Sequence, residues 1–150
     1  ADKRRLVEEL AEVAEVRISS ESLLPPDLDG HRLRVPLEQV HHYIVSADLL
    51  VGESATMCAE AAVLGTPAIF IDPHSRGYID EIETRYGLCV RYDPRQITQV
   101  VEKARAILAP ELPRRAFAAA HVRLLSDNMD VAAYQMAQID RLVRTRRPGD

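Results

Sequence analysis

Short apolar runs separated by segments with helical periodicity constrain this chain more than any other feature. Three such runs lie at 47–51, 67–71 and 88–92; Asp48 and Arg91 are the charged residues in them, and none of the runs alternates between apolar and polar residues as a half-buried strand does. Strands covered on both faces of a parallel sheet have this pattern. The sequence therefore predicts an α/β domain with a doubly wound, mostly parallel, Rossmann-like sheet.

Helical patterns and two weaker strand patterns fill the intervals between these runs. The segments 14–18 and 31–35 alternate with period two and are predicted as strands. Helices are predicted over 4–13, from Pro36 onward, over 53–64 with Gly65 as the C-terminal cap, over 77–86, after Asp93-Pro94, over 114–125, and after Asp127 or Asn128. Apolar stripes predict buried faces for the helix after Pro36 (Leu37, Val40, Ile44, Val45) and for the last helix (Ala132, Met136, Ile139, Val143).

Length and composition bound the organisation and the class of the protein. A chain of 150 residues is the size of one domain, here expected over 1–143 with a frayed tail at 144–150. A net charge of -4 argues against a dedicated nucleic-acid binder, and no apolar run is long enough to cross a bilayer. Cys58 and Cys89 are too few for a disulfide framework or a zinc site, so a reducing cytoplasm is the expected compartment.

The turn from the run at 47–51 into the next helix has the composition of a phosphate site. Gly52 supplies flexibility, Ser54 and Thr56 supply hydroxyls, and Ala55 leaves room for a ligand to approach the backbone. In doubly wound sheets, ligands lie at the carboxyl ends of the strands, where helix N-termini point their free N–H groups. The alternative reading is that Ser54 only caps its helix.

Other polar residues at the same sheet edge allow two readings each. Glu60 lies inside the helix, either facing solvent or placed to accept hydrogen bonds from sugar hydroxyls. The loop 72–78, which follows the next strand, is either a polar surface turn or a second wall of the same crevice. The spacings of the histidines, including His41 and His42, favour neither a metal site nor a catalytic triad, and no catalytic base is predicted.

The stretch 46–71 resembles the donor-site signature of nucleotide-sugar enzymes of the GT-B type. An Ala-Asp pair, an apolar strand, a Gly/Ser turn, a helical Glu and a Leu-Gly-Thr-Pro closing turn follow one another in that order. The sequence is similar to the UDP-N-acetylglucosamine 2-epimerases, to the murein N-acetylglucosamine transferase, and especially to an uncharacterised prokaryotic family related to both. The resemblance is most specific over 36–71 and continues, in the order of elements, from Val16 to Leu108.

The resemblance implies a role for each matching position. Ser54, Ala55 and Thr56 stand where the family holds the nucleotide diphosphate, and Glu60 stands where a helical Glu accepts the ribose hydroxyls. The remaining positions implied are those that meet the base (Val35, Leu37) and those expected near the donor sugar or distal phosphate (Ser75, Arg76, Tyr78). No cofactor and no metal is implied. The family commonly has paired glycines in the turn, whereas this chain has Ala55 and Thr56, which changes the room for a diphosphate.

The resemblance also implies that this chain is half of an enzyme. GT-B enzymes have two Rossmann-like domains, and this sequence starts at a helix that follows the second domain's first strand. We therefore expect a UDP-sugar-binding domain of a glycosyltransferase or hexosamine epimerase whose first strand and N-terminal domain are missing. The isolated chain is expected to be inactive, and its exposed sheet edge to favour a homodimer. The alternative is a non-catalytic binding or scaffolding module that keeps the fold without turnover.

Overall fold

A small parallel sheet lies at the centre of the computed structural model, which describes residues 2–109 and 114–146. Its strands are β1 (Leu50–Gly52), β2 (Ala68–Ile71) and β3 (Cys89–Tyr92), in the order β1-β2-β3. Both neighbouring pairs are parallel, with Val51 opposite Ile69 and Ile69 opposite Val90. The three apolar runs thus form adjacent parallel strands, as their pattern predicts.

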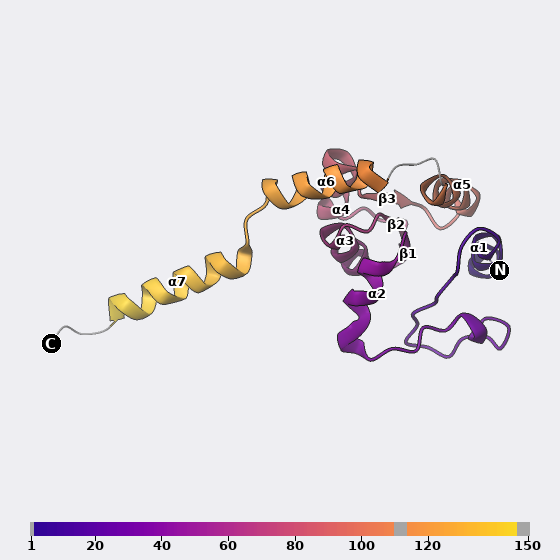
Figure 1. Cartoon of the computed structure of the whole chain (residues 1–150), viewed down its shortest axis with the longest axis horizontal. Coiled ribbons are helices and arrows are strands. Elements are labelled where there is room, and N and C mark those ends of the chain that lie inside the picture. The colour runs from indigo at the N-terminus through magenta and orange to yellow at the C-terminus, as the bar shows by residue number, and fades with distance from the viewer. Residues whose placement is uncertain (1, 110–113, 147–150) are drawn as a thin grey trace.

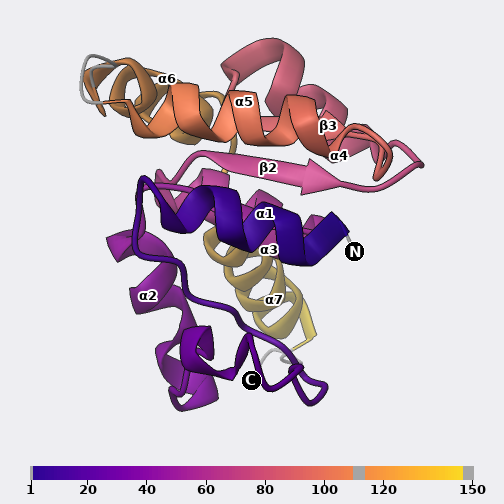
Figure 2. The same ribbon diagram turned by 90° about the vertical axis from the view of Figure 1, so that its right-hand side faces the viewer.

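Helices cover both faces of this sheet (Figures 1 and 2). Ile69 and Ile71 of β2 face a core shared with α1 (Asp2–Ala11) and α5 (Ile97–Leu108). Ala68 and Phe70 face the opposite core, which is built with α2 (Val40–Ser46), α3 (Ala55–Leu64), α4 (Gly77–Glu81) and α6 (Arg114–Asp127). All four β2 residues are buried. An α/β architecture with a parallel sheet is therefore confirmed.

The best-defined helix is the one predicted over 53–64. Ser54 is its N-cap, because the Ser54 hydroxyl accepts a hydrogen bond from the Met57 N–H. Gly65 ends it in the left-handed conformation, with φ of 88°, and the Gly65 N–H bonds back to the Ala61 and Ala62 carbonyls. Both ends of α3 are therefore fixed by local chemistry that the sequence shows.

The strands predicted at 14–18 and 31–35 do not form. The structure has one isolated parallel bridge there, between Ile18 and Arg32, with a short 3-10 turn, η1 (Asp29–His31), before it. Neither segment is hydrogen-bonded to β1 in the ladder of the described sheet. The alternation predicts strands, but a strand needs a neighbour over several residues, and here the pairing is limited to one position.

The helix expected after Pro36 begins with a 3-10 turn, η2 (Leu37–Gln39), before α2 takes over. This tighter turn changes the phase of the helix, so the predicted buried stripe is only partly correct. Ile44 is buried and Val40 packs on the core, whereas Leu37 is 85% exposed and Val45 lies mostly in solvent.

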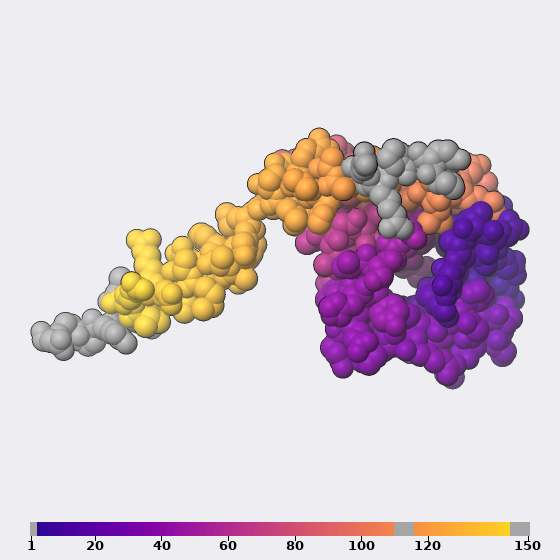
Figure 3. Space-filling view, viewed as in Figure 1, coloured from indigo at the N-terminus to yellow at the C-terminus, as the bar shows by residue number. Residues whose placement is uncertain are grey.

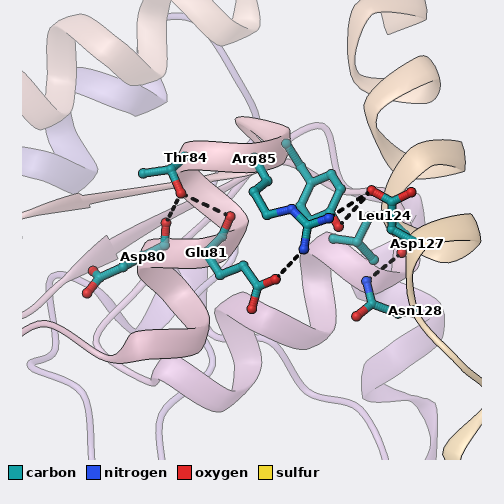
Figure 4. Close-up of polar contacts among 8 residues, drawn as sticks. Asp80, Glu81, Thr84, Arg85, Leu124, Asp127 and Asn128 are labelled. Carbon is teal, nitrogen blue, oxygen red and sulfur yellow. Dashed lines mark hydrogen bonds and ion pairs between the residues drawn. The ribbon is translucent and has the colours of Figure 1, made fainter.

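The helix predicted over 77–86 is divided into α4 and a π-helical turn, η3 (Ile82–Tyr86), which Gly87 ends with φ of 67°. Figure 4 shows how this turn is joined to the end of α6. Arg85 pairs with Glu81 at 2.6 Å and with Asp127 at 3.3 Å, and the Tyr86 hydroxyl donates to Asp127 at 3.1 Å. This polar cluster fixes the C-terminal end of α6 against the domain.

The last helix, α7 (Val131–Arg146), lies apart from the domain and points away from it (Figures 1 and 3). The predicted burial of its stripe is wrong, since every member is exposed: Ala132, Met136, Ile139 and Val143. No other described element covers that face. The helix continues through 144–146, part of the segment expected to fray, and 147–150 lie outside the described residues. Among the described helices, none combines the length and apolar character that spanning a bilayer requires.

Candidate functional site

The turn after β1 ends at the N-terminus of α3. Gly52 is the last residue of β1, and Ser54 has the extended backbone of an N-cap, with φ of -91° and ψ of 108°. The Ser54 hydroxyl accepts from the Met57 N–H at 3.3 Å, and the Ser54 carbonyl accepts from the Cys58 N–H at 3.0 Å. The Ser54 side chain thus caps α3, and phosphate binding at this turn stays a prediction. Glu53 beside it pairs with Lys3 of α1 at 2.7 Å.

The cap leaves part of the first turn of α3 available. The N–H groups of Ala55 and Thr56 precede the first intrahelical donor, so the helix itself offers them no acceptor. No hydrogen bond from either N–H to a described residue is present. These two donors, at the positive end of the helix dipole, are the groups of this turn that can bind an anion.

A groove of about 550 Å³ runs from this turn along one side of α3. Successive turns of the helix form its floor, because residues three and four apart share a face. One wall comes from α2 and the other from the start of α4. The lining residues are Thr56, Ala59, Glu60, Val63 and Leu64 from α3, with His41 and Tyr78 opposite. Most of the floor is apolar, so Glu60 supplies its negative charge.

The Glu60 carboxylate is held by an imidazole. His41 Nε2 lies 3.1 Å from Glu60 Oε2, and both side chains are partly exposed. Packing of α2 on α3 brings them together, although they are nineteen positions apart in the chain. The sequence does not predict this pairing, because spacing along the chain bears on His41 only as a possible metal ligand or triad member. A carboxylate in this position can accept hydrogen bonds from hydroxyl groups of a ligand in the groove.

The loop after β2 is organised by Asp72. Asp72 Oδ1 accepts from the His74 N–H at 2.7 Å, and Arg76 lies 3.8 Å from Oδ2. The hydrogen bond from the His74 N–H lowers the pKa of the Asp72 carboxyl below its usual value, and the charge of nearby Arg76 acts in the same direction. Arg76 also donates to the Ser75 carbonyl. Ser75 and Arg76 therefore belong to the loop's own network, and of the three predicted residues here Tyr78 alone lines the groove.

The two residues implied for the base lie elsewhere. Val35 lines a different hollow of about 510 Å³, together with Arg32, Arg34 and Tyr43. Leu37 is 85% exposed and lines neither space. The structure thus brings Thr56, Glu60 and Tyr78 to one groove that begins beside Ser54 and Ala55, and separates Val35 and Leu37 from it.

Nucleophilic and metal chemistry have little support among the described residues. Cys58 and Cys89 are both free and buried. The neighbouring Cys89 thiol and burial raise the pKa of Cys58, so its thiolate is disfavoured. Within 2–109 and 114–146, no three His, Cys, Asp or Glu side chains are grouped as a metal site would need.

Comparison with known proteins gives no match: no family model, no curated protein and no solved structure is similar enough to this chain to be recognised.

Proposed function

We propose that this chain is a nucleotide-sugar-binding domain, corresponding to the C-terminal half of a GT-B fold, and that its ligand is a UDP-sugar. The observation that supports this most is the position of Glu60 on a groove that begins at the free N–H groups of the α3 N-terminus. A nucleotide sugar has a diphosphate and vicinal hydroxyls a few ångströms apart, and this groove offers an anion site followed by a carboxylate. The signature over 46–71 points to the same ligand class.

The diphosphate would bind at the first turn of α3. The N–H groups of Ala55 and Thr56 and the Thr56 hydroxyl donate to its oxygens, and the helix dipole favours its charge. Ser54 contributes through the cap, which holds these N–H groups in place. Its hydroxyl is already an acceptor for Met57, so Ser54 is not expected to lose that bond to a phosphate.

The ribose would bind at Glu60. Its two hydroxyls donate to the carboxylate, and His41 on the far side holds the carboxylate in the groove. Tyr78 forms the opposite wall, toward the donor sugar. The resemblance also assigns Ser75 and Arg76 to the sugar or distal phosphate, and Arg76 would reach it only by leaving its contact with Asp72.

Turnover would require a second domain. In a glycosyltransferase or a hexosamine epimerase of this type, the acceptor site and much of the catalysis belong to the N-terminal domain, which is the proposed partner in cis. This half would stabilise the charge that develops on the leaving diphosphate, through N–H groups already oriented for it. The exposed helix α7 would contact that domain, since none of its apolar stripe is used here.

Isothermal titration with UDP and UDP-N-acetylglucosamine tests the proposal. Glu60→Gln keeps the size of the side chain but loses the charge, and is expected to weaken UDP binding about tenfold or more, because hydrogen bonds to a charged acceptor contribute about 1.5–3 kcal/mol. Glu102→Gln, an exposed change on α5 at the other face of the sheet, is the matched control and should leave affinity unchanged. A folded chain that binds neither ligand would favour the non-catalytic scaffolding module.

A further inference from the structure

One edge of the central sheet is unpaired. β1 is the outer strand, and β2 is its one neighbour in the described sheet. Leu50 lies opposite Ala68 and donates its N–H to the Pro67 carbonyl, so its polar groups point toward β2. In a parallel strand, the polar groups of alternate residues point to opposite sides. The N–H and C=O groups of Leu49 and Val51 therefore point outward from the sheet.

A second extended segment has the complementary arrangement. The Ile18 N–H donates to the His31 carbonyl at 2.8 Å, and the Ile18 carbonyl accepts from the Leu33 N–H at 2.9 Å. Both polar groups of Ile18 are thus used on one side. The adjacent Arg17 turns its N–H and C=O to the other side, where no described residue forms a backbone hydrogen bond with them.

An opening separates the N-terminal segment from the body of the molecule, and Figure 3 shows that it passes through the surface. Four apolar side chains on this side of the sheet remain only partly buried: Leu6 of α1, Val16, Leu49 and Val51. All four pack on the same core, which contains Ile69, Ile71 and Val100. A core whose flanking apolar side chains, from α1, from the segment around Val16 and from β1, are all partly exposed has room for a further layer of them.

We propose that this opening is a binding slot for one extended β-strand, running parallel to β1. The strand would exchange backbone hydrogen bonds with Val51 on one side and with Arg17 on the other, and would thereby continue the β1-β2-β3 sheet. Its alternate side chains on the α1 side are apolar, because they complete the core around Leu6, Val16 and Val51. The ligand is therefore an apolar strand of about five residues, the usual strand length. The slot is independent of the proposed nucleotide site.

A strand joined to the chain tests the slot. A segment of sequence Thr-Val-Ile-Val-Thr is attached to the N-terminus through a flexible Gly/Ser linker, which gives it a local concentration in the millimolar range. The matched control carries Thr-Pro-Ile-Pro-Thr, which cannot donate the same hydrogen bonds. Amide hydrogen exchange by NMR then follows the Val51 and Arg17 N–H groups, with Leu23, whose side chain is 94% exposed, as an internal reference.

The expected result is at least tenfold slower exchange at both Val51 and Arg17 with the valine segment than with the proline segment, and no difference at Leu23. Protection of Val51 alone would mean that a strand adds to β1 without entering the slot, which overturns the proposal. Equal exchange in the two fusions also overturns it. If the unmodified chain already protects Val51, and does so only at concentrations where light scattering shows a dimer, the edge binds a second copy instead.

Discussion

Ser54 shows how one residue can be needed for binding without touching the ligand. Its hydroxyl caps α3 by accepting from Met57, and this cap fixes the N–H groups that we assign to the diphosphate. Stability and affinity can therefore be changed separately at this position. Ser54→Ala is expected to affect stability, and Ser54→Asp is expected to affect affinity.

Ser54→Ala removes the cap and is expected to lower the free energy of unfolding by about 1 kcal/mol. Ser54→Asp keeps a capping oxygen, so its unfolding free energy should stay close to that of the unchanged protein. The added negative charge beside the diphosphate should nevertheless lower UDP affinity more than tenfold. Urea denaturation and calorimetric titration measure the two effects. A Ser54→Asp chain that binds UDP normally would place the phosphate elsewhere.

Gly65 is a position where the backbone excludes other residues. Its φ of 88° is strained for any L side chain, and a Cβ there would lie 3.0 Å from His121 Nδ1. Gly65→Ala is expected to lower the free energy of unfolding by about 1–2 kcal/mol. Gly30→Ala is the control, since nothing lies within 4 Å of a Cβ at that position and its φ is not positive. Equal unfolding midpoints for the two variants would contradict this explanation.

Both caps of α3 could be predicted from the sequence, because a cap depends on residues within one turn. The Glu60–His41 contact could not be predicted, since it depends on how α2 packs against α3. In the sequence, a helical Glu flanked by alanines has the same pattern whether its side chain faces solvent or lines a groove. The roles implied for Val35 and Leu37 stay predictions, and the structure places both residues away from the groove, after a segment that forms one bridge instead of the predicted strand.

At the level of elements, the sequence predicts best the strands of the central sheet. The runs at β1, β2 and β3 are recognised without knowledge of their partners, because apolar character without alternation is itself the signal. Burial along the whole strand is found for β2, whereas β1 and most of β3 are partly exposed. The segments 14–18 and 31–35 alternate correctly, but a strand exists only where a neighbour pairs with it. They meet in a single bridge, between Ile18 and Arg32, and neither segment joins the β1-β2-β3 ladder.

The junction between η3 and α6 gives a prediction at this scale. The Tyr86 side chain is buried, and its hydroxyl donates a hydrogen bond to Asp127. Burial, followed by this hydrogen bond, raises the pKa of the Tyr86 phenol. Tyr86→Phe removes one hydrogen bond and is expected to lower the free energy of unfolding by about 0.5–1.5 kcal/mol. Tyr134→Phe on the exposed helix α7 is the matched control, expected to have no effect. Chemical denaturation compares them, and equal losses would contradict the role of this contact.

At the scale of the whole molecule, the chain consists of a packed α/β domain and an unpacked last helix. Periodicity alone predicts the stripe on α7, and periodicity shows that a helix has an apolar face but not what covers it. Helix formation here is confirmed, whereas burial is wrong. The amphipathic face of α7 is thus available to the N-terminal domain that we propose as a partner.

Substitution of one isoleucine in the domain and one in α7 tests the difference in packing between them. Ile69→Ala removes a fully buried side chain from β2 and is expected to lower the free energy of unfolding by about 2–5 kcal/mol. Ile139→Ala, at a position 51% exposed on α7, should change it by less than about 0.5 kcal/mol. Urea unfolding of both variants at low protein concentration tests this. A large loss for Ile139→Ala would mean that α7 packs on the domain in solution.

The central claim is that the groove along α3 binds a nucleotide diphosphate. Titration of the isotope-labelled chain with UDP, followed by amide NMR, tests it most directly. We expect saturable shifts at Ala55, Thr56 and Glu60, with a midpoint moved to higher UDP concentration by Glu60→Gln and unchanged by Glu102→Gln. Shifts confined to the hollow around Val35 and Arg34, or no shifts in a folded chain, would contradict it.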